Sequence, residues 1–322
     1  DILVVLAYLM NTILPVVSSI LLVMLLGYGL SKKLLTDTGF WQGISKLSYW
    51  VLFPVLMVRT LANATIDTEL LFPLFAIFIA ALILILIYCV LVARLLGQDG
   101  PSTSSIAQGG IRHNGFVGLA VLFDMFGLPG QELGALIIAV LVPPTNVLSV
   151  LSVSFLVSKK QNQPLTYLIS KELLRNPMIV SVAIGLSLNI LDISIPNILD
   201  QSMALMSRAA LPLLLLSIGA SLKIRALKGN WLPLAAALSA KLVVFPALLL
   251  GGALWFNLTP LATVCLVVFG ALPAAVSAYP FIQQMGGNAK LMADIITLQT
   301  LASLVGLTFW ASVAIHITGL TL

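Results

Sequence analysis

Long apolar runs, separated only by short polar connections, occupy nearly the whole chain of 322 residues. The run from residue 70 to residue 95, for example, contains a single charged residue, Arg94. A soluble domain needs a charged surface, with about a quarter of its residues charged, whereas only 8% are charged here and 60% are hydrophobic. A bilayer allows nearly every helix to be apolar on all sides. The sequence therefore predicts an all-α membrane protein with many crossings.

Charge, proline and glycine divide these runs into ten predicted spans of the length that a bilayer requires. The spans are residues 12–30, 44–62, 70–95, 104–126, 133–157, 167–191, 202–222, 231–256, 261–284 and 292–318. Too little chain remains for a separate soluble domain. Residues 1–9 lack the basic start and the cleavage site of a signal peptide. We expect them to be an extension that precedes a natural start at Met10.

Ten membrane crossings would place most of the positive charges on one side of the membrane and most of the loop acids on the other. One side collects 12 of the 16 Lys and Arg residues, whereas the other side collects five acids and a single expected cation, Arg59. The positive-inside rule then makes the first side cytoplasmic and places both termini outside. Because the basic residues are scattered between apolar runs, we expect no nucleic-acid partner. Cys89 and Cys265 both lie inside apolar runs, which argues against a disulfide framework.

The sequence contains a candidate internal repeat. Shifting it by about 160 residues, within the repeat lengths worth testing, aligns unusual features in three pairs of spans. The pairs are Pro15 with Pro177, residues 52–54 with 210–212, and residues 114–127 with 273–286. A five-plus-five inverted repeat, residues 10–158 and 167–320, would explain one constant offset and is typical of secondary transporters. Chance remains an alternative, because proline and small residues are common in membrane helices.

The fourth span is the least apolar one. Residues 104–119 contain four glycines together with Gln108, Arg112 and His113. Irregular backbone inside a membrane persists only where protein or a water-filled cavity satisfies it. We therefore predict a break from Arg112 to Gly115, after which a half-helix presents its positive N-terminal end to an anion.

The ninth span carries a matching interruption, because Pro273 removes a backbone donor and clashes with the preceding turn. Two broken helices at corresponding places in inverted halves indicate a substrate site. If spans 4 and 9 cross, Asn114 and Ser277 lie near the crossing. The candidate substrate-binding residues are Arg112, His113, Asn114, Gly115, Gly118, Pro273 and Ser277.

Ionisable residues inside a membrane are functional candidates by default. Arg112 either clamps a carboxylate or pairs with Asp124 or backbone carbonyls. We interpret His113 as a polar neighbour of the break rather than a proton carrier. Lys241 has no carboxylate in its own span, and either pairs with a group on the broken helices or substitutes for a coupling cation. We expect Arg208 to be an interfacial or scaffold charge, and we assign no functional role to His316.

Several motifs together resemble the auxin efflux carrier family, in the family's order and across the chain from Met10. They are residues 112–119 (RHNGFVGL), 175–177 (RNP), 210–212 (ALP) with 219–222 (GASL), and 271–276 (ALPAAV). Two features depart from the family pattern. The family often has a proline two residues after the glycine at the position of Gly118, but Ala120 stands there. The connection at residues 159–166 is as short as in bacterial permeases.

The resemblance implies ten helices in two inverted repeats, with broken spans 4 and 9 crossing in a transport unit of spans 3, 4, 5, 8, 9 and 10. Spans 1, 2, 6 and 7 would form a scaffold and a homodimer interface. Bacterial members are associated with malate, malonate and related organic anions. The short connection makes auxin itself an unexpected substrate, and a bacterial inner membrane the expected location.

We therefore expect a secondary transporter for a small organic anion such as a dicarboxylate, without a cofactor or metal. A sodium-coupled symporter of the bile-acid or arsenite type is an alternative, although spans 4 and 9 contain few acids for an ion site. An enzyme is not expected, because the chain lacks an HExxH motif, a phosphate loop and an intramembrane aspartate pair. A non-transporting receptor would have no need of two broken helices.

Overall fold

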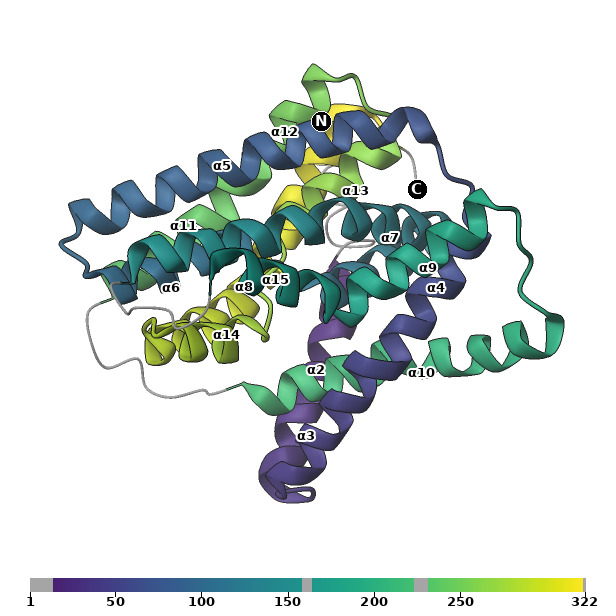
Figure 1. Ribbon diagram of the computed structural model, residues 1–322, viewed down its shortest axis with the longest axis horizontal. Coiled ribbons are helices and arrows are strands. Elements are labelled where there is room, and N and C mark those ends of the chain that lie inside the picture. The colour runs from purple at the N-terminus through teal and green to yellow at the C-terminus, as the bar shows by residue number, and fades with distance from the viewer. Residues whose placement is uncertain (1–13, 158–163, 223–230, 321–322) are drawn as a thin grey trace.

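The computed structural model describes residues 14–157, 164–222 and 231–320, which form helices and no β-strand (Figure 1). Six helical stretches in these ranges are long and apolar enough to cross a membrane. A bent pair of helices raises the number to seven. A multi-pass helical membrane protein is therefore confirmed, whereas the ten spans and the inverted repeat stay predictions.

The first part of the chain forms helices of very different lengths. They are α2 (Leu14–Lys33), α3 (Thr38–Leu47), the π-helix η2 (Ser48–Leu52), α4 (Phe53–Asn63), the 3-10 turn η3 (Thr68–Leu70), α5 (Leu71–Leu95), α6 (Gly100–Ile111) and α7 (Gly115–Leu156). Asp99 caps α6 by accepting a hydrogen bond from the Ser102 N–H at 2.9 Å. Hydrogen bonds from Ser102 hold the pKa of the Asp99 carboxyl below its ordinary value.

The second part begins with a sharp bend. Its elements are α8 (Leu165–Leu174), α9 (Pro177–Ile190), α10 (Asn197–Ser221), α11 (Leu232–Ser239), the π-helix η4 (Ala240–Val244), α12 (Phe245–Trp255), α13 (Pro260–Gly270), α14 (Ala278–Met285) and α15 (Ala289–Thr318). The predicted span 167–191 is bent by 58° between α8 and α9. Proline disfavours helical backbone in the residue before it, and Asn176, before Pro177, instead caps α9 through the Met178 N–H.

The long helix α7 folds back on itself at Gly127, whose φ of 61° and ψ of −142° are not helical. A Cβ atom on Gly134 would lie 2.8 Å from Leu119 Cδ2, although 15 residues of straight helix would separate them by about 22 Å. The stretch Gly100–Leu156 therefore contains a reversal, although it counts as one candidate span. The predicted boundary between residues 126 and 133 falls at this reversal.

Both π-helices precede a proline at the second position of the next helix, Pro54 in α4 and Pro246 in α12. Proline removes one donor and clashes with the carbonyl four residues earlier, and a π-bulge relieves this conflict. For Pro246 that carbonyl belongs to Leu242, which accepts a hydrogen bond from Trp310 Nε1 at 2.7 Å. This local widening places Lys241 on the inner side of η4, where it is fully buried.

The helices pack as two neighbouring groups. In one, α2 packs against α10 and α4 against α9 and α10; in the other, α5, α6, α11, α12, α13 and α15 pack together with α7 (Figure 1). Glycines permit the closest approach in the first group. Gly27 of α2 lies against the Leu216 carbonyl, and Gly219 of α10 lies against the Met24 carbonyl.

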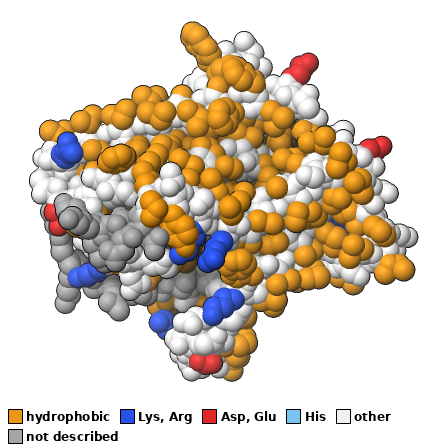
Figure 2. All heavy atoms as spheres, in the orientation of Figure 1, with side chains coloured by type: hydrophobic (Ala, Val, Ile, Leu, Met, Phe, Trp, Pro, Cys, Tyr) orange, Lys and Arg blue, Asp and Glu red, His pale blue; other side chains and the backbone are white. Residues whose placement is uncertain are grey.

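The outer surface is largely apolar. Figure 2 shows hydrophobic side chains over most of this face, with the visible Lys and Arg side chains mainly in its lower and left parts. In the apolar segment of Thr68–Leu95, only 33% of the residues are buried within the protein. The apolar side chains of the other residues need lipid to cover them. Basic residues end α2, α3 and α8. The orientation of the termini stays a prediction.

Candidate functional site

The first predicted break is present between α6 and α7. The helix α6 ends at Ile111, Arg112 has extended backbone, and α7 begins at Gly115 with Asn114 as its N-cap. Gly109 and Gly110 weaken the preceding helix, and the Asn114 side chain accepts a hydrogen bond from the Val117 N–H at 3.5 Å. Because α6 has 12 residues, the break lies about 18 Å along the helix axis from its start.

The second break separates α13 from α14 and contains Pro273. The two breaks touch, since the Asn114 N–H donates a hydrogen bond to the Pro273 carbonyl at 2.9 Å. The two breaks expected from glycine and proline positions are therefore joined by a direct backbone contact. The facing ends of four half-helices, α6, α7, α13 and α14, meet around it.

Gln299 of α15 holds the two breaks together. Its Oε1 accepts a hydrogen bond from the Ala274 N–H at 3.0 Å, and its Nε2 donates to the Gly109 carbonyl at 3.1 Å. Nε2 also donates to the Ala237 carbonyl at 2.8 Å. One buried amide thus satisfies backbone groups on both broken helices and on α11.

A cavity of about 240 Å³ adjoins the first break and separates two walls of different character. The wall on the broken helices is polar and contains Arg112, which is the only cation among the described residues that line the cavity. Its polar members are Arg112, His113, Asn114, Thr145, Asn146 and Ser277. The opposite wall comes from α3, η2, α9 and α10, and carries neutral polar groups among apolar ones. These groups are Ser45, Tyr49, Asn176, Ser217 and Ser221.

Arg112 provides the positive charge of the cavity, with its side chain only 8% exposed. Its Nη2 donates to Asn146 Oδ1 at 3.3 Å, and its guanidinium lies 4.8 Å from the centre of the Phe281 ring. Its Nη1 and Asn146 Nδ2 have no hydrogen-bond partner within the described ranges. Two buried donors at the cavity are therefore available to an acceptor from outside the chain.

The alternative in which Arg112 pairs with Asp124 does not hold in the structure. Asp124 is exposed on α7, where it accepts a hydrogen bond from Ser19 Oγ at 3.3 Å. It lies nine residues into α7, about 14 Å along the helix axis from Gly115 at the break. No carboxylate lies within ion-pairing distance of Arg112 in the part of the chain that the structure describes.

The other candidate residues divide between the cavity and its support. His113, Gly115 and Ser277 line the cavity with Asn114, and the His113 ring lies 4.7 Å from that of Phe245. Gly118 lies outside it, where a Cβ atom would meet Leu272 and Phe269. Pro273 contributes its carbonyl, and its ring lines a separate small hollow beside α2.

The structure adds four polar residues that the sequence pattern alone did not single out. Asn146 and Gln299 stand inside apolar runs, where a polar residue is itself a signal of function. Tyr49 and Asn176 face the cavity, and the Tyr49 hydroxyl donates to Asn176 Oδ1 at 3.5 Å. The described residues contain no group of three or more His, Cys, Asp or Glu side chains that could hold a metal.

A family model described as membrane transport protein matches residues 12–311. The chain belongs to this family. It is the auxin efflux carrier family whose motifs the sequence resembles. No curated protein matches the sequence.

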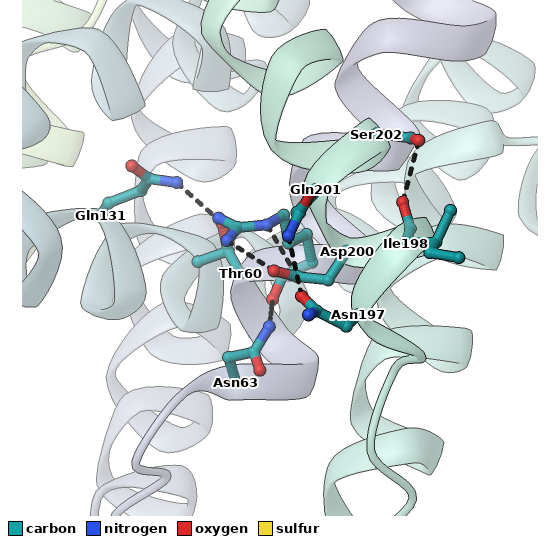
Figure 3. A network of polar contacts seen from close by, with 9 residues as sticks. Thr60, Asn63, Gln131, Asn197, Ile198, Asp200, Gln201 and Ser202 are labelled. Atoms are coloured by element: carbon teal, nitrogen blue, oxygen red, sulfur yellow. Dashed lines mark hydrogen bonds and ion pairs between the residues drawn. The ribbon is translucent and has the colours of Figure 1, made fainter.

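This membrane transport protein has a second polar region, which joins its two helix groups away from the cavity (Figure 3). Arg59 of α4 and Asp200 of α10 form a two-pronged ion pair with distances of 2.9 and 3.1 Å. Next to it, Gln131 of α7 donates a hydrogen bond to Thr60 Oγ1 of α4 at 2.7 Å. The ion pair lies within the first helix group, whereas the Gln131 bond crosses to the second.

Proposed function

We propose that this membrane transport protein is a secondary transporter that binds a small organic anion at the two breaks. The observation that carries the proposal is the unpaired Nη1 of Arg112 at the cavity. A buried cation without a partner is costly, and a carboxylate would supply both the opposite charge and the missing acceptor. Asn146 Nδ2 would add a neutral donor, and the N-terminal end of α7 would add the positive end of its helix dipole.

The walls of the cavity favour a short anion with a second polar end. One cation lines the cavity, and the hydroxyl groups of Ser45, Ser217 and Ser221 lie on the opposite wall. A dicarboxylate or hydroxyacid could place one carboxylate at Arg112 and its other polar group at these hydroxyls. Malate and malonate, which the family resemblance suggests, are therefore the first substrates to test.

Transport would follow from movement between the two helix groups. The cavity lies between residues of α3, η2, α9 and α10 on one side and residues of the two broken helices on the other. In this proposal α2, α3, α4, α9 and α10 belong to the scaffold together with α8, which packs mainly against α7. The transport unit consists of α5, α6, α7 and α11 to α15. Sliding or rocking of the transport unit would carry the breaks past the polar wall and expose the site to each side in turn. In this proposal the scaffold forms a homodimer in a bacterial inner membrane, with both termini outside.

Uptake of radiolabelled malate and malonate into vesicles containing the purified protein tests the proposal. Arg112→Gln should lower the transport efficiency by about 10- to 100-fold, because charged hydrogen bonds contribute about 1.5–3 kcal/mol. Arg208→Gln is the matched control, because Arg208 is exposed on α10. Unchanged uptake by Arg112→Gln or by Asn114→Ala would remove the assignment of the site, and absence of uptake by the wild type would contradict these substrates.

A further inference from the structure

Lys241 is a fully buried cation that the proposed anion site does not use. Its Nζ lies 3.5 Å from the Gly110 carbonyl oxygen and 4.9 Å from the centre of the Phe245 ring. No carboxylate lies within 4.0 Å of it within residues 14–157, 164–222 and 231–320. A lysine in the protein interior normally has an acidic partner, so its neighbours must explain its position.

The neighbouring carbonyl belongs to the broken end of α6. The last carbonyls of a helix lack partners within the helix and form the negative end of its dipole. Here the Gln108 carbonyl accepts from the Arg112 N–H, the Gly109 carbonyl accepts from Gln299 Nε2, and the Gly110 carbonyl faces Lys241. In broken membrane helices, such carbonyl ends are the places where transporters coordinate Na⁺.

Among the described residues, no acid from the surrounding helices contacts the amino group. Cys89 of α5 approaches Gly110 so closely that a Cβ atom there would lie 2.6 Å from its Sγ. The Tyr88 hydroxyl is engaged with Ser239 at 3.0 Å, and the His113 ring lies tilted against the Phe245 ring, with 4.7 Å between the ring centres. The α15 side chain at this level is the neutral Gln299, which contacts Gly109.

We propose that Lys241 is a built-in cation that occupies the carbonyl end of α6 in place of a dissociable Na⁺ or K⁺. The position of its ammonium group between a helix-end carbonyl and an aromatic face matches what a bound monovalent cation needs. The inference deepens the proposed function and rests on it for its role in transport. It implies that the wild-type protein transports without Na⁺ or K⁺, and that removing the side chain creates a cation site.

Thermal unfolding of purified Lys241→Ala tests the cation site without any transport assay. The variant should be less stable than the wild type in choline chloride. Its midpoint should rise with sodium, potassium or methylammonium chloride, because a ligand that binds only the folded state stabilises it. Wild type and Lys290→Ala, which removes an exposed lysine of α15, should show no such rise. If Lys241→Ala does not fold, Lys241→Ser, whose side chain is also too short to fill the position of the ammonium group, should replace it and respond to the same salts.

Malate uptake then tests the role in transport. Wild-type uptake should be equal in sodium, potassium and choline salts. Lys241→Ala should lose about tenfold in choline and recover in part with one of the small cations. The inference is overturned if no small cation stabilises the variant, or if Lys241→Met transports as well as the wild type in choline. If the wild type carries no malate or malonate, the proposed function fails on those substrates, while the thermal shift still decides whether a cation occupies the Lys241 position.

Discussion

At the scale of single residues, Arg112 and Asn146 determine the polarity of the cavity. Asn146 accepts one guanidinium hydrogen bond through Oδ1 while its Nδ2 has no partner within the described ranges. An amide therefore orients the arginine without neutralising it. A neutral partner leaves the positive charge of Arg112 available to an anion, whereas an acidic partner would form an ion pair with it.

We expect Asn146→Asp to abolish uptake without unfolding the protein. The new carboxylate has nearly the same shape and would form an internal ion pair with Arg112, in competition with the substrate. Uptake of labelled malate and the thermal midpoint in detergent measure the two effects separately. Thr145→Ser, a mild change beside it in the same wall, is the control. Wild-type uptake by Asn146→Asp would contradict the proposed binding mode.

The sequence is informative about residues at the breaks and much less so about their partners. Glycine and proline act on the backbone locally, so Arg112, Asn114 and Pro273 could be placed at interruptions before the structure was known. Asn146 and Gln299 act through contacts with distant segments. The direction in which these two side chains point depends on how α7 folds back and how α15 packs. The helical period of 3.6 residues alone does not reveal either arrangement.

At the scale of elements, the two broken helices depend on one amide for their connection. Gln299→Leu keeps the side-chain size but leaves the Ala274 N–H and the Gly109 carbonyl without the Gln299 partner. We expect a loss of about 2–4 kcal/mol in unfolding free energy, since each unsatisfied buried group costs about 1–3 kcal/mol. Denaturation in detergent measures it. Gln201→Leu, at an exposed glutamine of α10, should change stability little, and equal effects of the two variants would contradict the role of Gln299.

The crossing of α2 and α10 depends on glycine in an equally specific way. Gly27→Ala would place a methyl group against the Leu216 carbonyl, whereas Gly29→Ala, two residues later, meets no atom within 4 Å. We expect Gly27→Ala to lose about 1–3 kcal/mol by overpacking. Gly29→Ala should be neutral or slightly stabilising, because alanine favours helix. Thermal midpoints decide, and equal values for the two variants would refute the close approach.

Of the helix interruptions, the two breaks could be predicted from the sequence, whereas the bend and the π-helices could not. Both breaks were predicted from residues whose backbone preferences are strong. The 58° bend between α8 and α9 was not predicted, although Asn176 and Pro177 supply a cap and a missing donor at that point. The π-helices before Pro54 and Pro246 were not predicted either. They depend on whether neighbouring groups, such as the Trp310 indole N–H, can donate a hydrogen bond to the backbone carbonyl that the proline leaves without a partner.

At the scale of the whole molecule, a few polar contacts join the two helix groups. Ser19 of α2 bonds Asp124 of α7, and Thr60 of α4 bonds Gln131 of α7. A sliding mechanism has to break both contacts. Because the packing of apolar side chains between the two helix groups is non-directional, we expect these hydrogen bonds to favour one position of the groups relative to each other.

A cross-link between Ser19→Cys and Asp124→Cys should therefore block uptake by at least about tenfold, and reduction should restore it. A short bifunctional thiol reagent suits the 3.3 Å distance between the native side-chain oxygens. Cys89 and Cys265 are fully buried and should react little. A pair at Asn197 and Gln201, both within α10, controls for the reagent. Undiminished uptake by the cross-linked protein would exclude movement between α2 and α7.

The backbone hydrogen bond from Asn114 to Pro273, reinforced by Gln299, ties the two breaks into a unit that keeps its internal geometry. If the two breaks keep this geometry as they reorient, the Arg112 side of the site would hold an anion equally well from either compartment, and only the contacts with the opposite wall would differ. Such a carrier has no preferred direction of its own. Net flux through it would reverse whenever the concentration and electrical gradients reverse, and the same molecule would serve nutrient capture in one condition and metabolite release in another.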